Sequence, residues 1–113
     1  ILIDGKKETA VQRVSNTKPI PQNNIDLILH TALAGEFSGK KLIYLEAGSG
    51  ATEAINQKII KEVSENITIP LIVGGGIRTE KQLEDAYNSG ADLVVIGTAF
   101  ENDESFFNDL KKQ

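Results

Sequence analysis

A short apolar run occurs four times in this sequence, each time followed by a segment with helical spacing. The runs occupy residues 1–3, 41–48, 69–76 and 91–100. Strands that are apolar on both faces and alternate with amphipathic helices are typical of a parallel sheet covered by helices. The sequence therefore predicts an α/β fold with about four βα units and parallel strands.

The segments between the runs predict the helices. A polar stretch with two prolines, residues 7–24, predicts a long loop before the first of them. The first helix has Gly39 as its stop signal, and its apolar face carries Ile25, Ile28, Leu29, Ala32 and Leu33. The second helix is predicted over residues 52–65, with an apolar row formed by Ala51, Ile55, Ile59 and Val63.

Two further helices are expected in the C-terminal part of the chain. One begins near Glu80, where Thr79 and Gln82 have the spacing of a capping box. Its buried face is expected to consist of Leu83, Ala86, Tyr87 and Gly90. The other is short and carries Phe106, Phe107 and Leu110.

Glycines at the ends of the last two runs indicate an anion site. The range Gly74–Gly76 closes the third run, and Gly97 with Thr98 closes the fourth. Glycine lets backbone amides approach an anion that a Cβ would obstruct, and a helix start just beyond adds unsatisfied N–H groups. Such a pair of loops matches the phosphate site of (β/α)8 barrels, which follows strands 7 and 8. We therefore expect the whole chain to be the C-terminal half of one phosphate-binding (β/α)8 TIM barrel, equivalent to strands 5–8. A dinucleotide-binding sheet is disfavoured because G-x-G-x-x-G after a first strand is missing.

A glutamate stands at the end of the second apolar run. Side chains alternate across a strand, so Tyr44 and Glu46 share the face opposite that of Ile43, Leu45 and Ala47. The aliphatic set suits a face covered by helices, which directs Tyr44 and Glu46 into the barrel near its C-terminal mouth. An unpaired buried carboxylate costs several kcal/mol, a cost more readily tolerated where the carboxylate meets a substrate hydroxyl. The following Gly-Ser-Gly predicts a third anion-binding loop.

Other readings of the polar residues stay open. Glu46 could instead be exposed and paired with Lys40 or Lys41. Arg78 is suited either to holding a phosphate or to a salt bridge at a helix start. His30 is expected on a helix surface, and Asp4 is expected to cap the turn at the glycine that follows it.

Composition excludes several classes of protein. The net charge of −4 over 113 residues argues against a nucleic-acid binder, and no apolar run is long enough to anchor the chain in a membrane. The absence of cysteine excludes disulfides and thiolate metal sites and fits a cytoplasmic location. Because the chain lacks methionine and opens inside an apolar run, we expect it to be the C-terminal part of a longer polypeptide.

Three strings carry a resemblance to a known family. They are YLEAGSGA at residues 44–51, IPLIVGGGIRT at 69–79 and GADLVVIGTAFE at 90–101. Together with ILIDG, SNTKPIP and TALAGE upstream, they resemble the polyprenylglyceryl-phosphate synthase family, which includes geranylgeranylglyceryl and heptaprenylglyceryl phosphate synthases. The likeness covers essentially the whole chain.

The resemblance implies an activity and a site. Members of this family are prenyltransferases that join sn-glycerol 1-phosphate to a polyprenyl diphosphate, such as geranylgeranyl diphosphate, and release pyrophosphate in ether-lipid (phospholipid) biosynthesis. Tyr44 and Glu46 would bind the glycerol hydroxyls, with Glu46 accepting the reacting proton. The implied glycerol-phosphate site consists of Tyr44, Leu45, Glu46, Ala47, Gly48, Ser49, Gly50, Gly75, Gly76, Gly97 and Thr98.

The resemblance also implies parts that this chain does not carry. The Mg²⁺ that serves the diphosphate would have its ligands in the N-terminal half of the barrel, and none in this chain. Without that half, a sheet of four strands would have two unpaired edges and an exposed apolar lumen. We therefore expect the chain alone to be inactive and to pair with its missing half or, as a homo-oligomer, with a copy of itself.

Two rival functions remain at this point. Another phosphate-binding barrel enzyme, an isomerase or synthase acting on sugar phosphates, would share the two terminal glycine loops but not YLEAGSG. A non-catalytic phosphate-binding half-barrel would keep the loops without using the carboxylate.

Overall fold

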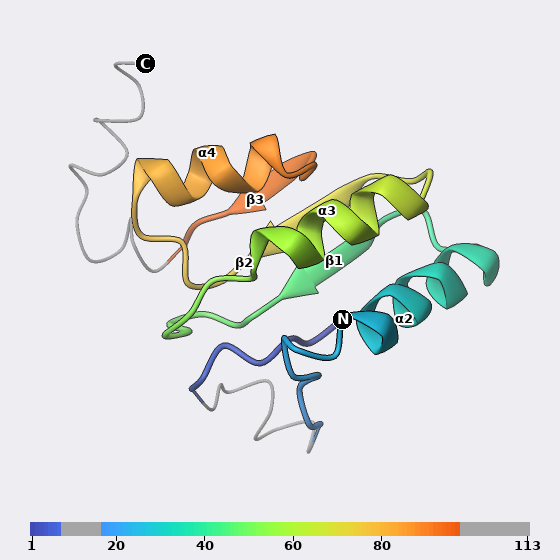
Figure 1. The fold of residues 1–113 in the computed structure, drawn as a ribbon, viewed down its shortest axis with the longest axis horizontal. Helices are drawn as coiled ribbons and strands as arrows, with labels where there is room; N and C mark the ends of the chain where they lie inside the picture. The colour runs from blue at the N-terminus through green and yellow to red at the C-terminus, as the bar shows by residue number, and fades with distance from the viewer. Residues whose placement is uncertain (8–16, 98–113) are drawn as a thin grey trace.

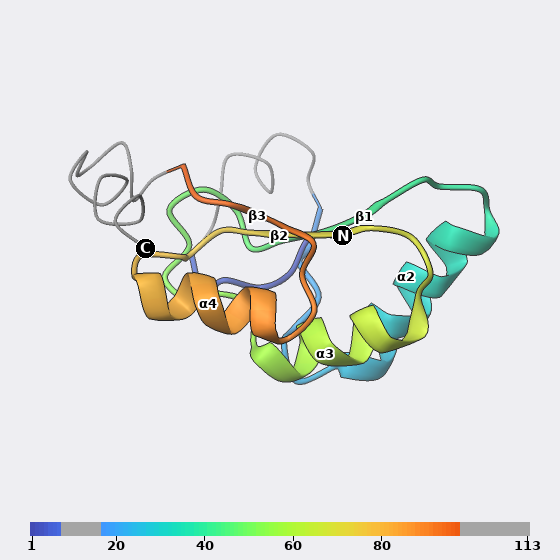
Figure 2. The same ribbon diagram turned by 90° about the horizontal axis from the view of Figure 1, so that it is seen from above.

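Three parallel strands form a sheet that carries three helices on one of its faces (Figures 1 and 2). The structure is a computed structural model that describes residues 1–7 and 17–97. Within these ranges the elements are α2 (Ile25–Phe37), β1 (Ile43–Glu46), α3 (Gln57–Asn66), β2 (Leu71–Gly74), α4 (Glu80–Asn88) and β3 (Leu93–Val95). The sheet order β1-β2-β3 follows the chain, with α3 and α4 as the crossovers. The predicted α/β architecture with parallel strands is confirmed.

The register of the sheet brings the carboxyl ends of all three strands to one edge. Glu46 at the end of β1 pairs with Gly74 on β2, and Gly74 pairs with Val95 on β3. Two residues earlier, Tyr44 pairs with Ile72. Partners in a parallel ladder project from the same face, so the loops that follow the strands start side by side at this edge.

The core lies between the sheet and the helices. Its largest fully buried side chains are Ile3, Ile28, Leu45, Ile59, Ile60, Val63, Leu71 and Val73, and burying each such side chain is worth about 1.5–3 kcal/mol. The opposite face of the sheet is not covered by described residues, as Figure 2 shows. Leu42, Leu93 and Val95 remain 48%, 52% and 42% exposed.

Two helix boundaries agree with the sequence signals. Asn24 caps α2 by accepting a hydrogen bond from the Leu27 amide, and Gly39 follows the helix end with φ +96°. The Thr79 and Gln82 side chains form the predicted capping box of α4. Tyr87 was expected on the buried face of α4 but is 44% exposed. Ala86 is the buried residue, and one further position turns the side chain by about 100° around the helix, toward solvent.

The helix predicted over residues 52–65 starts five residues later. The amides of Thr52 and Glu53 donate to the Gly5 carbonyl at 2.9 and 3.0 Å, which holds this segment outside the helix. The α3 helix begins after Asn56, whose side chain accepts from the Lys58 amide at 2.8 Å. Ala51 and Ile55, expected in the apolar row of this helix, are buried but lie in the loop before it.

The first apolar run forms isolated bridges rather than a full strand. Leu2 bridges Glu46 in parallel, and Ile3 bridges Ile20 in the loop before α2. The Ile3 amide donates to the Glu46 carbonyl at 2.8 Å, so the run occupies the place of a fourth strand beside β1. The predicted helix with Phe106, Phe107 and Leu110 lies outside the described residues. In the described ranges every helix falls short of the length and apolar character that crossing a membrane requires.

Candidate active site

A cavity of about 100 Å³ opens at the carboxyl ends of the strands. Its wall comes from the inner face of the sheet and from the loops after β1, β2 and β3. The lining residues are Tyr44, Glu46, Gly48, Ser49, Gly50, Gly75, Gly76, Ile77, Arg78, Val95, Ile96 and Gly97. Eight of the eleven residues predicted for the site thus come together around one cavity.

The other three predicted residues do not line this cavity. Leu45 and Ala47 are fully buried on the face that packs against the helices, because side chains alternate along β1. At the carboxyl end of β1 these two residues offer only backbone groups to the site. The Ala47 amide donates to the Gly74 carbonyl at 2.9 Å. Thr98 lies outside the described residues.

Tyr44 and Glu46 project from the inner face into the cavity, as the alternation predicted. In the described part of the chain no lysine or arginine forms an ion pair with Glu46, so the alternative pairing with Lys40 or Lys41 is not formed. Gly74 makes room for the phenol, because a Cβ at that position would lie 2.7 Å from the Tyr44 hydroxyl oxygen. A half-buried carboxylate and a phenol therefore share one cavity wall.

The glycine loops pack against each other through their backbones. Gly75 has φ +91°, and a Cβ there would lie 2.6 Å from the carbonyl oxygen of Gly48. Gly76 has φ +75°, and a Cβ there would lie 2.6 Å from the Ala54 amide nitrogen. Gly5 also packs against this loop, with its Cβ position 2.5 Å from the Cβ of Ala51. These glycines allow three strand ends to meet more closely than side chains would permit.

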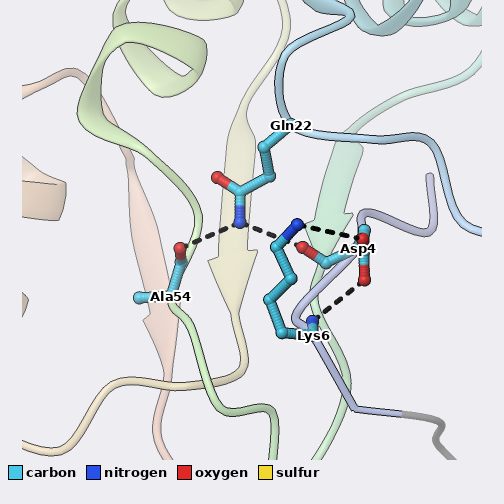
Figure 3. A network of polar contacts seen from close by, with 4 residues as sticks. All are labelled: Asp4, Lys6, Gln22 and Ala54. Carbon is cyan, nitrogen blue, oxygen red and sulfur yellow. Dashed lines mark hydrogen bonds and ion pairs between the residues drawn. The ribbon is translucent and has the colours of Figure 1, made fainter.

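Gln22, which the sequence did not single out, ties the loop after β1 to its neighbours. Its Nε2 donates to the carbonyls of Asp4 and Ala54 at 3.0 and 3.1 Å (Figure 3), and its Oε1 accepts from the Asn56 amide at 2.8 Å. One side chain therefore satisfies three backbone groups from two loops. A polar residue between a proline and a helix start gives no sequence signal for this role.

Arg78 forms a second link to the loop after β1. Its guanidinium donates to the Ala51 carbonyl at 2.7 Å and to the Gly76 carbonyl at 3.3 Å. Among the described residues Arg78 forms no salt bridge at the start of α4, so the second of its two expected roles is not observed.

Asp4 and His30 lie as the sequence predicted. Asp4 accepts a hydrogen bond from the Lys6 amide at 2.9 Å and thus caps its turn, and His30 is exposed on α2.

The environment of Tyr44 keeps its hydroxyl protonated. Burial raises the pKa of the Tyr44 phenol above its ordinary value, and the Glu46 carboxylate raises it further. Both effects disfavour the phenolate, in the first case through lost hydration and in the second through repulsion between negative charges. At neutral pH Tyr44 is therefore a hydrogen-bond donor beside a carboxylate acceptor.

We expect the phenol of Tyr44 to titrate at higher pH than a free tyrosine. The folded state holds this proton more tightly than the unfolded chain. The free energy of unfolding should therefore fall as pH rises through the range in which Tyr44 loses its proton. The measurement is an ultraviolet pH titration of the protein and of Tyr44→Phe, whose difference isolates this residue. Glu46→Gln should lower the midpoint pH of the Tyr44 titration part of the way toward that of a free tyrosine. A midpoint equal to that of a free tyrosine in the unmodified protein would contradict the burial of the phenol.

The fold and the glycine-lined cavity place the chain among the (β/α)8-barrel proteins, of which it forms a half-barrel. The chain belongs to the PcrB family, which matches residues 1–113. It is 62% identical over 104 residues to a geranylgeranylglyceryl phosphate synthase of Zunongwangia profunda, covering 92% of this chain and 44% of that relative. A synthase of the same name from Thermococcus kodakarensis is 49% identical over 88 residues, or 78% of this chain and 35% of the relative. The family resemblance of the sequence strings is confirmed.

Solved structures agree with this assignment. A (S)-3-O-geranylgeranylglyceryl phosphate synthase from Thermoplasma acidophilum, in complex with sn-glycerol-1-phosphate, superposes with a TM-score of 0.82 at 36% identity. The match covers 88% of this chain and 40% of that one. The Thermoplasma volcanium enzyme gives a TM-score of 0.81 at 37% identity, over 90% of this chain and 41% of its own. The chain thus spans less than half the length of these relatives.

Proposed function

We propose that this chain is the acceptor-binding, C-terminal half of a prenyltransferase barrel that alkylates sn-glycerol 1-phosphate with a polyprenyl diphosphate, in ether-lipid (phospholipid) biosynthesis in the cytoplasm. The observation that carries the proposal is one cavity that combines an inward carboxylate, a phenol and three glycine-rich strand ends. The sn-glycerol-1-phosphate complex of the Thermoplasma acidophilum relative supports the same ligand here.

The residues of the cavity divide between binding and proton transfer. The glycerol phosphate binds to the amides of the three strand-end loops, with Ser49 among them. Tyr44 and Glu46 hold the glycerol hydroxyls. The C3 oxygen forms a bond to C1 of the prenyl chain while the bond from C1 to the diphosphate breaks, pyrophosphate leaves, and the hydroxyl proton passes to Glu46. Positioning of the acceptor beside the carboxylate supplies much of the rate enhancement.

Among the described residues, no three Asp, Glu or His side chains come together. Mg²⁺ prefers several oxygen ligands, among them carboxylates and the phosphates of its substrate. We propose that the Mg²⁺ ligands that serve the diphosphate lie in the N-terminal half of the barrel, as the family resemblance implies.

The inner face of the sheet, which no described residue covers (Figure 2), supports an N-terminal half that completes the barrel. Leu42, Leu93 and Val95 expose apolar surface toward the lumen, and the edge of β3 that no described strand pairs with is an aggregation risk. "Full-length protein" below denotes this chain together with that half. The same apolar face makes the chain alone prone to pair with a copy of itself as a homo-oligomer.

The test compares the full-length protein with residues 1–113 alone. Transfer of a labelled geranylgeranyl group to sn-glycerol 1-phosphate is expected in the presence of Mg²⁺ for the full-length protein only, because the chain alone lacks half of the barrel. Calorimetry should show binding of sn-glycerol 1-phosphate by the full-length protein. Binding of other sugar phosphates without any prenyl transfer would instead favour a different phosphate-binding barrel enzyme.

A further inference from the structure

The charges in the cavity do not balance if a glycerol phosphate binds there. This inference therefore rests on the proposed function. A phosphate monoester carries about −1.5 to −2 at neutral pH, and Glu46 places a further carboxylate in the same cavity. Of the described residues that line it, only Arg78 brings a positive charge. Backbone amides contribute only partial positive charges. The bound phosphate therefore needs cationic side chains close to the glycine loops that hold it.

Arg78 is held at this loop by both of its neighbours. Its guanidinium donates to the carbonyls of Ala51, in the loop after β1, and Gly76, in the loop after β2, and leaves further N–H donors of the planar group unused. Its backbone is fixed as well, because the Arg78 amide donates to the Gln82 side chain at 2.7 Å. The charge thus stands at a defined place between the Gly-Ser-Gly loop and the triple-glycine loop.

Lys7 reaches the same point from a different segment. Its Nζ lies 3.6 Å from the position of a Cβ on Gly50, which lines the cavity next to Ala51. Among the described residues no carboxylate pairs with Lys7. The adjacent Lys6 differs in this respect, since its Nζ lies 3.7 Å from an Asp4 carboxylate oxygen (Figure 3). The two consecutive lysines therefore have different surroundings. Lys6 is paired with a carboxylate, whereas Lys7 lies against the Gly-Ser-Gly loop.

We infer that Arg78 and Lys7, which converge on Gly50 and Ala51, supply the positive charge that binds the phosphate of the acceptor. Arg78 contributes from the cavity wall and also links the two loops, and Lys7 contributes from the rim. The site consequently selects a doubly charged phosphate ester over neutral polyols.

The experiment measures the affinity of the full-length protein for sn-glycerol 1-phosphate by calorimetry at several salt concentrations. Arg78→Gln is expected to weaken binding about tenfold or more, as loss of a charged hydrogen-bonding partner does. The affinity of Arg78→Lys should lie between those of the unmodified protein and Arg78→Gln, because an ammonium keeps the charge but not the planar arrangement of N–H donors. Lys7→Met should weaken binding roughly threefold to tenfold. Lys6→Met is the matched control and should bind within about twofold of the unmodified protein.

The salt dependence separates charge from mere support of the loops. Loss of a cation should make the affinity less sensitive to salt in Arg78→Gln and Lys7→Met. Weaker binding with an unchanged salt dependence, or equal effects of Lys7→Met and Lys6→Met, would overturn the inference. If the unmodified protein does not bind sn-glycerol 1-phosphate at all, the proposed function itself fails, which is a distinct result.

Discussion

Glu46→Gln in the full-length protein should lower turnover by about 10²- to 10⁴-fold while sn-glycerol 1-phosphate still binds. Glutamine keeps the size of the side chain and can still bond a glycerol hydroxyl, but it does not accept the proton that the hydroxyl must lose. The measurement is kcat for prenyl transfer together with the dissociation constant of the acceptor from calorimetry. The expected result is a fall in kcat with a nearly unchanged dissociation constant.

A matched control for this substitution lies in the loop that follows β1. Glu53→Gln makes the same chemical change at an exposed residue that does not line the cavity, and its turnover should equal that of the unmodified protein. If Glu46 only held the glycerol, Glu46→Gln would weaken acceptor binding and leave kcat unchanged. Unchanged kcat would therefore remove Glu46 from proton transfer, whatever happens to the affinity.

The local rules of the sequence predicted the parts of this site that depend on neighbours along the chain. A period of two along β1 was enough to put Tyr44 and Glu46 on the inner face and Leu45 in the core. The spacing of Thr79 and Gln82 was enough to place the start of α4. Glycines at the ends of parallel strands predicted a cavity at the carboxyl edge of the sheet, because such ends meet there whatever the details of the loops.

The parts that the sequence did not reveal depend on contacts between distant segments. The row Ala51, Ile55, Ile59 and Val63 fits a helix, yet the Gly5 carbonyl holds the amides of residues 52 and 53 and delays α3 to Gln57. Gln22 binds backbone groups of Ala54 and Asn56, which lie more than thirty residues away along the chain, and no local pattern indicates such a bridge. Tertiary contacts of this kind override local propensity.

Packing between distant loops also explains why a side chain at Gly75 should cost more stability than the backbone conformation alone would suggest. Gly75 and Gly39 both have a positive φ, +91° and +96°. A Cβ on Gly39 would meet nothing within 4 Å, whereas one on Gly75 would lie 2.6–2.7 Å from backbone atoms of Gly48. Backbone atoms yield far less easily than the end of a flexible side chain, so the two positions separate the cost of the backbone conformation from the cost of the collision.

Gly75→Ala is accordingly expected to lower the free energy of unfolding by about 2–5 kcal/mol and to abolish detectable binding of sn-glycerol 1-phosphate. The left-handed conformation costs an alanine about 1–2 kcal/mol, and the collision adds about 1–3 kcal/mol, as overpacking does. Gly39→Ala is the matched control, which should lose only the first amount and bind the acceptor normally. Urea denaturation and calorimetry of the two full-length variants check both parts. Equal losses of stability in the two variants would mean that the loops after β1 and β2 move apart without cost, and the cavity would then not depend on their close approach.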